Sequence, residues 1–215
     1  MKRTLQFTAS LAILLVLSTG LAAQTLKEFF NNTELNLTYL GIDYTKNKLI
    51  NNSEANTYDI KNKLYQSINE VVVNEPRQYD ISAAFRKTNI SKDLSAMKAK
   101  NDKINADDIP SMNGSDFSRL QEADIAAAVR GLSLSKSGIG LVFVMEGMKH
   151  EGKRHYGAVW VALIDMKSKK VLMTERFETE ASGAGFRNMW ASIIKKTLNT
   201  IEKKKYKEWK EKYGV

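Results

Sequence analysis

Two histidines, His150 and His155, have the residue type and spacing of a potential metal site. They flank the loop Glu-Gly-Lys-Arg of an expected hairpin, so their imidazoles and the loop carboxylate could face one zinc ion. Three basic residues crowd the same loop and would repel a cation, namely Lys149, Lys153 and Arg154. We therefore interpret both histidines as solvated residues at the tip of a hairpin, and we predict no metal and no other cofactor.

Three carboxylates, Glu146, Asp165 and Glu175, lie in or beside expected strands and are candidates for acid–base chemistry. A general acid and a general base must face the same cleft, and sequence spacing alone does not establish this. The chain has no cysteine nucleophile, no serine elbow and no His-Glu-x-x-His helix. We predict no catalytic residues and no enzyme, with a carboxylate-dependent hydrolase as the alternative.

A glycine-rich turn, Gly183-Ala-Gly185-Phe-Arg187, lies between an expected strand and an expected helix. Amides at the start of a helix attract anions, and Arg187 would add positive charge. The turn lacks the third glycine and the Lys-Ser/Thr of a phosphate-binding loop. Gly183, Gly185 and Arg187 are therefore a weak candidate for anion binding, because a tight turn alone also explains the glycines.

The C-terminal residues 203–215 form a tail rich in lysine and aromatic residues, which we expect to be helical. Its aromatic side chains are spaced three and four residues apart and extend the apolar stripe of the preceding helix. They could dock on the sheet while the lysines face water, or the tail could bind an anionic membrane or lipopolysaccharide surface. The candidate surface residues are Lys203, Lys204, Lys205, Tyr206, Lys207, Trp209, Lys210, Lys212 and Tyr213.

The first half of the chain is predicted to contain a strand and then a helix. Alternating residues predict a strand over 35–43, and apolar residues at helical spacing predict a helix that ends near Val73, before Pro76. Residues 79–85 have the composition of a short edge strand. Asparagine, aspartate and lysine dominate residues 89–114, which we predict to be a loop-rich insertion with one amphipathic helix.

The second half is predicted to be a helix, three strands and a last helix. A helix over the Ile125–Val129 region precedes strands at 139–148, 156–165 and 171–180, which form an antiparallel meander. The second strand is apolar on both faces, so it belongs in the middle of a covered sheet. The order predicts an α+β fold with a mainly antiparallel sheet, helices packed on it, and a long C-terminal helix.

The N-terminal residues 1–23 have the pattern of a cleaved export signal. Lys2 and Arg3 precede a short apolar run, and small residues up to Ala23 suit a signal peptidase. Residues 24–215 would then form one α+β domain, and without cysteine its core must be stable without disulfides. We expect a periplasmic or secreted bacterial protein.

The net charge of +9 is concentrated at the ends of the chain. The signal carries two of these charges, and eight lysines against three glutamates give residues 195–212 a local +5. Only about +2 remains for the body of the protein, which does not favour a broad nucleic-acid interface.

The predicted order of strands and helices resembles the amino-terminal domain of the TolB translocation protein. The most specific match is the hairpin Val161-Ala-Leu-Ile-Asp-Met-Lys-Ser-Lys-Lys-Val-Leu172. It is also similar to lipoprotein activators of penicillin-binding proteins, to the periplasmic part of the curli secretion channel, and to a type of exported protein from Bacteroidetes-like bacteria. Lys169 departs from this pattern, since the family usually has a glycine there, at a position that favours positive φ. The anchoring cysteine of the lipoprotein members is also missing.

The resemblance implies non-catalytic work, namely the binding of other envelope proteins. We therefore expect an exported, non-enzymatic envelope protein whose sheet is a scaffold for a protein partner. Peripheral binding of an anionic envelope surface through the lysine-rich tail is the alternative.

Overall fold

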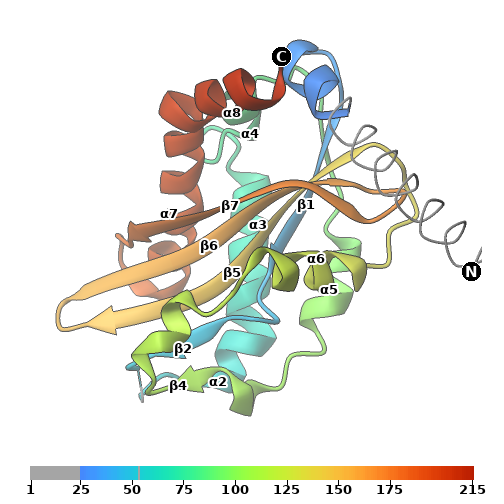
Figure 1. Cartoon of the computed structure of the whole chain (residues 1–215). Coiled ribbons are helices and arrows are strands. Elements are labelled where there is room, and N and C mark those ends of the chain that lie inside the picture. Colours follow the sequence, from blue (N-terminus) through green and yellow to red (C-terminus); the bar gives the residue numbers. More distant parts are fainter. Residues whose placement is uncertain (1–24, 53) are drawn as a thin grey trace, which may run out of the picture.

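A seven-stranded sheet lies at the centre of the structure (Figure 1). The computed structural model describes residues 25–52 and 54–215. The predicted signal peptide, residues 1–23, therefore lies outside the described residues. The strands are β1 (Leu37–Asp43), β2 (Lys48–Ile50), β3 (Ile90–Lys92), β4 (Pro110–Ser111), β5 (Ile139–Glu151), β6 (Arg154–Asp165) and β7 (Lys170–Glu180).

The α+β class and the C-terminal meander are confirmed, but the sheet is mixed. The long strands β5, β6 and β7 pair antiparallel as predicted. The short strands all pair parallel: β1 with β3 and β5, and β2 with β4 and β5. The prediction of a mainly antiparallel sheet overlooked these ladders, because β3 and β4 were not predicted as strands and the direction in which β1 and β2 pair with β5 is set by tertiary structure.

Strand β6 explains why its sequence is apolar on both faces. Val159, Val161 and Leu163 point into one hydrophobic core, and the residues between them point into a second core on the opposite face. Successive side chains of a strand alternate between faces, so a strand covered on both sides needs apolar residues at every position. The prediction of a central strand in a covered sheet is confirmed.

Helices cover the two faces of the sheet (Figure 1). One face packs against α3 (Tyr65–Asn74), α4 (Ile81–Phe85), α7 (Gly185–Thr200) and α8 (Tyr206–Tyr213). The other face packs against α5 (Ser95–Asn101) and α6 (Glu122–Arg130). The predicted helix before Val73 consists of α2 (Thr57–Asp59), the π-helical turn η1 (Ile60–Leu64) and α3, and a second π-helical turn, η4 (Ile201–Lys205), joins α7 to α8.

Residues 79–85, predicted to be an edge strand, contain the short helix α4 instead. Asp80 caps this helix by accepting a hydrogen bond from the Ala83 N–H, and Arg86 ends it in the left-handed conformation at φ 48°. The N-terminal cap therefore decided the local structure here.

Residues 89–114 contribute two short strands to one edge of the sheet, the edge opposite β7. They contain β3, α5, the 3₁₀ turn η2 (Ala106–Asp108) and β4. Strand β3 adds to the free edge of β1, and β4 adds to the free edge of β2. Both strands are too short for an alternating pattern to be read from the sequence.

The turn between β6 and β7 requires the backbone geometry that the family resemblance implied. Lys169 has φ 57°, and it is one of three non-glycine residues with positive φ in the described part of the chain. A side chain in this conformation is strained relative to glycine. Asp165 tightens the same turn by accepting a hydrogen bond of 2.8 Å from the Ser168 N–H.

The two ends of the described chain pack together (Figure 1). Residues 25–31 form a helix, and the Asn31 side chain donates to the Gly214 carbonyl at 2.6 Å. Lys87 is 2% exposed and donates to the Phe29 and Asn32 carbonyls at the end of this helix. Burial, together with the nearby charge of Lys210, lowers the Lys87 pKa to about 8. A buried ammonium group thus fastens the N-terminal helix to the end of α4.

Candidate functional site

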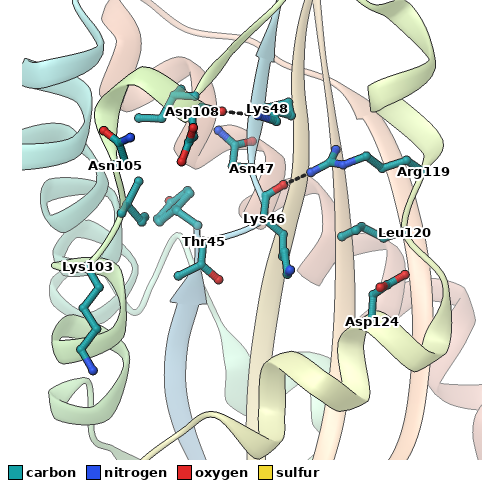
Figure 2. Close-up of a pocket in the computed structure, with 13 residues that line it drawn as sticks. Thr45, Lys46, Asn47, Lys48, Lys103, Asn105, Asp108, Arg119, Leu120 and Asp124 are labelled. Carbon is teal, nitrogen blue, oxygen red and sulfur yellow. Dashed lines mark hydrogen bonds between the residues drawn. The ribbon is translucent and has the colours of Figure 1, made fainter.

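A polar cleft with a volume of about 570 Å³ lies beyond the carboxyl end of β1 (Figure 2). Three segments distant in sequence form its walls, namely residues 44–48, 103–109 and 119–124. The loop of residues 44–47 joins β1 directly to β2, and the chain leaves the neighbouring β3 toward α5. In open α/β sheets, ligands bind in crevices outside the carboxyl ends of the strands.

The first wall is held by Asp43, the last residue of β1. Its side chain is 1% exposed and accepts hydrogen bonds from the Thr45 N–H at 2.8 Å and the Thr45 hydroxyl at 2.6 Å. Its second oxygen accepts from Lys100 of α5, whose ammonium group also donates to the Ala128 carbonyl of α6 at 2.7 Å. One buried ion pair therefore ties the cleft loop to both helices of this face.

Two asparagine side chains form hydrogen bonds with the backbone groups at the end of β1, beyond the point where the neighbouring strand β3 ends. Asn69 of α3 accepts from the Ile42 N–H at 2.7 Å and donates to the Ile42 carbonyl. Asn101 of α5 accepts from the Tyr44 N–H at 2.9 Å and also donates to the Ile42 carbonyl. Buried backbone groups need such partners, so these side chains fix the base of the cleft.

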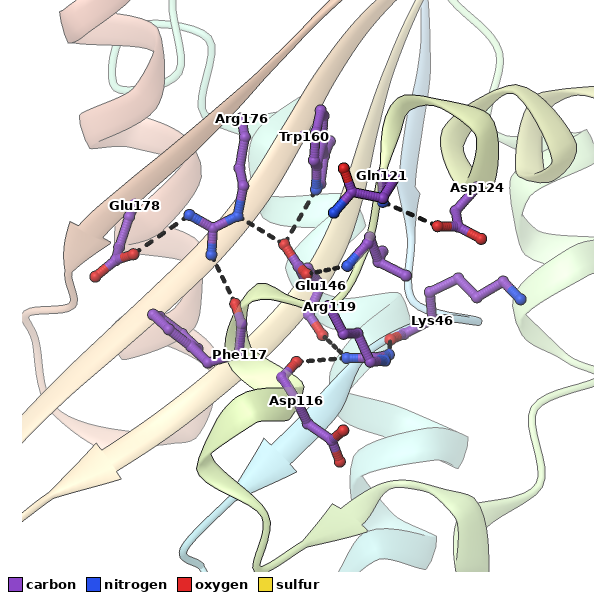
Figure 3. Close-up of polar contacts among 11 residues, drawn as sticks. Lys46, Asp116, Phe117, Arg119, Gln121, Asp124, Glu146, Trp160, Arg176 and Glu178 are labelled. Carbon is purple, nitrogen blue, oxygen red and sulfur yellow. Dashed lines mark hydrogen bonds and ion pairs between the residues drawn. The ribbon is translucent and has the colours of Figure 1, made fainter.

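The opposite wall is held by Arg119. Its guanidinium donates to three backbone carbonyls, those of Asp116 at 2.6 Å, Glu146 at 3.2 Å and Lys46 (Figures 2 and 3). The bond to Lys46 joins the two walls. Because all three acceptors are carbonyls, the charge of Arg119 is not neutralised by a carboxylate.

The cleft carries more positive than negative charge. Four cationic residues line it against two carboxylates, Asp108 and Asp124, for a net charge of +2; the cations are Lys46, Lys48, Lys103 and Arg119. None of the six forms an ion pair within the described residues. Lys48 donates to the Asp108 carbonyl and Asp124 accepts from the Gln121 N–H. Lys46 and Lys103 are exposed at the rim.

Asn47 lies at the inner end of the cleft and has one unused polar atom. The residue is 4% exposed, and its Nδ2 donates to the Tyr65 hydroxyl at 2.7 Å. Its Oδ1 is buried and has no hydrogen-bond partner among the described residues. An unpaired buried acceptor costs about 1–3 kcal/mol, so this atom lowers the stability of the loop at the base of the cleft.

Glu146, a sequence candidate for acid–base chemistry, is the centre of a buried network behind the Arg119 wall (Figure 3). It is the extra residue of a β-bulge in β5 and is 0% exposed. Its carboxylate accepts from the Leu120 N–H at 2.6 Å, the Trp160 indole at 3.0 Å and Arg176 Nε at 2.8 Å. Arg176 in turn donates to the Phe117 carbonyl at 2.6 Å. The network fastens residues 117–120 to the sheet.

The three candidate carboxylates do not share a cleft. Arg176 contacts Glu146, so its neighbour Glu175 points to the opposite face of β7, where it contacts Trp209 and pairs with Lys205 at 2.6 Å. Asp165 holds the β6–β7 turn. Each carboxylate has its own structural partners, and the sheet separates Glu146 from Glu175.

The two histidines form a cross-strand pair at the far end of the β5–β6 hairpin. His150 lies opposite His155 with ring centroids 4.2 Å apart, and both rings contact Trp190 of α7. Asn52 lies 3.1 Å from His150 Nε2. The pair is half-buried against α7, and not solvated as the sequence suggested. Within residues 25–52 and 54–215, no three metal-ligating side chains come together.

We expect the histidine pair to make the fold less stable in acid. Burial, followed by the charge of His155, lowers the His150 pKa below its ordinary 6.5. As the pH falls below about 6.5, the unfolded chain binds a proton before the folded chain does, so stability decreases with a slope of at most about 1.4 kcal/mol per pH unit. Urea unfolding at neutral and mildly acidic pH measures this, and His150→Gln should flatten the dependence. An equal decrease in the variant would contradict the assignment.

The glycine-rich turn begins α7 as expected. Gly183 has φ 116° and Gly185 has φ 75°, conformations that favour glycine. Arg187 donates to the side chain of Asn188 at 3.0 Å, and it lines a depression of about 400 Å³ with Gly183. Nearby Ser192 already accepts from the Ser182 N–H and donates to the Met189 carbonyl. The turn geometry accounts for these glycines without a ligand.

The C-terminal tail divides into a buried and an exposed side. Tyr206 is 1% and Trp209 is 3% exposed, and Tyr213 stacks on Phe30. These aromatic residues belong to the core and are not available to an external surface. Lys205 is held by Glu175 and Glu208. The lysines that remain exposed are Lys203, Lys204, Lys207, Lys210 and Lys212.

Sequence reasoning missed the cleft, because its residues come from loops that have no shared motif. The available signal was an aspartate at the end of an apolar strand, Asp43, followed by Lys46-Asn-Lys48. Such residues are typical of turns, and only the fold places them beside Lys103 and Arg119.

Comparisons with known proteins give weak structural similarity. No protein-family model and no curated protein sequence matches the chain. The PelC dodecamer from Paraburkholderia phytofirmans has a TM-score of 0.35 and 13% identity over 78% of this chain and 88% of that chain. A putative neuraminyllactose-binding hemagglutinin homolog from Helicobacter pylori has a TM-score of 0.37 and 11% identity, covering 85% and 88%. Lipoprotein GNA1162 from Neisseria meningitidis has a TM-score of 0.31 and 8% identity, covering 79% and 98%.

Among residues 25–52 and 54–215, each helix is too short or too polar to cross a membrane.

Proposed function

We propose that this chain is an exported, non-enzymatic envelope protein that binds a partner protein at the cleft beyond β1. The observation that carries the proposal is the rigid construction of the cleft. Asp43, Asn101 and Arg119 hold its walls from three directions, while the charged side chains at the rim have no ion-pair partner in the part of the chain that the structure describes. Preorganised walls with exposed polar groups favour binding, because little ordering entropy is lost.

The placement of the acidic residues supports binding over hydrolysis. A hydrolase would need two of Glu146, Asp165 and Glu175 beside one reacting group. Instead, these residues lie in a buried network, in a turn and on the opposite face of the sheet. The export pattern of residues 1–23 and the resemblance of the 161–172 hairpin to TolB-type domains also favour an envelope protein.

Site-specific photocrosslinking in cells that export the full chain tests the proposal. A photoreactive phenylalanine derivative at Asn105, an exposed residue of the cleft, should form an adduct of one discrete mass. The matched control places the same residue at Glu202, which is exposed on the C-terminal helix. Adducts of equal yield from both positions, or none from Asn105, would contradict the proposal.

The alternative function is binding of an anionic envelope surface through the tail, and the exposed lysines favour it. Deleting the tail would not test this, because deletion also removes Tyr206 and Trp209 from the core. Replacing Lys203, Lys204, Lys207 and Lys210 with glutamine should keep the fold, because all four side chains are exposed. If the tail binds membranes, the variant should lose co-sedimentation with anionic vesicles at low salt, and unchanged sedimentation would exclude this function.

A further inference from the structure

We propose that the cleft recognises an acidic peptide segment of its partner. This rests on the proposed function and adds the chemical class of what is bound. The first support is the charge of the lining, which has four cations against two carboxylates. Lys46 and Lys103 reach the rim from two different walls, and neither has an ion-pair partner within the described residues (Figure 2).

The inner cations cannot be neutralised from within the fold as it stands. Arg119 and Lys48 both donate hydrogen bonds to backbone carbonyls. These bonds hold the two side chains in place, but a carbonyl does not neutralise a positive charge. An acidic side chain entering the cleft would therefore meet a positive potential from these fixed groups and from the exposed ammonium groups of Lys46 and Lys103. Such a lining speeds the encounter with an acidic partner as well as stabilising it.

The acceptors in the same cleft distinguish a peptide from a small anion. The carboxylates of Asp108 and Asp124 would repel a bare phosphate or carboxylate ion, but they can accept hydrogen bonds from backbone N–H groups. A peptide with acidic side chains supplies both negative charge and N–H donors, which matches the mixed set.

Binding of a fluorescein-labelled hexaglutamate peptide to the full chain, followed by fluorescence anisotropy, tests the proposal. We expect saturable binding that weakens as salt is raised. Reversing the rim charges with Lys46→Glu and Lys103→Glu should weaken binding about tenfold or more, since each reversal replaces an attraction with a repulsion. Because both residues are exposed, the variant should keep the unfolding midpoint of the parent.

The matched control reverses two lysines of the tail, with Lys203→Glu and Lys204→Glu, for the same change in net charge. Binding should be unchanged in this variant, and an equal loss in both variants would overturn the proposal. Displacement of the peptide by millimolar inorganic phosphate at constant ionic strength would assign the cleft to small anions and would also overturn it.

The crosslinking experiment separates this inference from the proposed function. An adduct at Asn105 that persists when Lys46 and Lys103 are reversed would leave the function intact and overturn the acidic-peptide assignment. Absence of any adduct at Asn105 would reject the function itself. Loss of the adduct only in the rim-charge variant would support both.

Discussion

Replacing Glu146 with alanine should lower the free energy of unfolding by about 3–5 kcal/mol, because the change removes a fully buried carboxylate that three donors share. The Leu120 N–H and the Trp160 indole would lose their acceptor, and Arg176 would lose the closer of its two ion pairs. Since Leu120 also lines the cleft, partner binding should weaken together with stability. Urea unfolding followed by circular dichroism measures the first effect.

Glu178→Ala is the matched control, because Glu178 contacts the same arginine from an exposed position at 3.3 Å. Its loss should change stability by less than about 1 kcal/mol, as for other surface ion pairs. A Glu146→Ala protein of full stability that had lost a chemical activity would refute the structural role and restore the carboxylate hydrolase.

Trp209→Ala should cost about 3–5 kcal/mol, the usual range for removing a buried large aromatic side chain. The indole packs against Phe85 and Phe177 and donates its N–H to Glu175. A tail that acted only as a surface anchor would show no such dependence. Thermal or urea unfolding of the variant therefore tests whether the tail is part of the core.

Two further substitutions separate the components of this effect. Trp209→Phe keeps an aromatic ring but loses the hydrogen bond to Glu175, so its cost should be smaller than that of alanine. Lys210→Ala, one residue further and exposed, should change stability by less than about 0.5 kcal/mol. Equal stability of the Trp209→Ala and Lys210→Ala proteins would show that the helix does not dock as described.

The sequence predicted the long elements of this fold well, because each carries a repeated pattern. Strand β6 has apolar residues on both faces, and α7 has an apolar stripe. In both elements, the spacing of apolar residues in the sequence matches the faces that are buried in the structure. Strands β3 and β4 have too few residues to show a period, and their parallel pairing depends on crossovers between distant segments. Asp80 shows the other kind of failure, in which one cap converted an apparent strand into a helix.

The candidate site was less predictable than the fold. The sequence indicates Glu146 as a titratable residue in a strand. Its structural role depends on its contacts with Arg176 and Trp160, and only the pairing of β5, β6 and β7 brings these residues together. The cleft depends on three loops whose contacts are set by tertiary structure. Lys169 was an exception, because its positive φ followed from the local turn and the resemblance together.

The pairing of Asn31 with Gly214 has a practical consequence for how the protein can be attached and displayed. Both ends of the described chain meet at the amino end of β1, whereas the cleft opens at its carboxyl end. A reporter fused at Val215, or a linker joining the ends to create new termini elsewhere, would therefore leave the cleft unobstructed. Immobilising the protein through its C-terminus should likewise orient every molecule with the cleft toward solution.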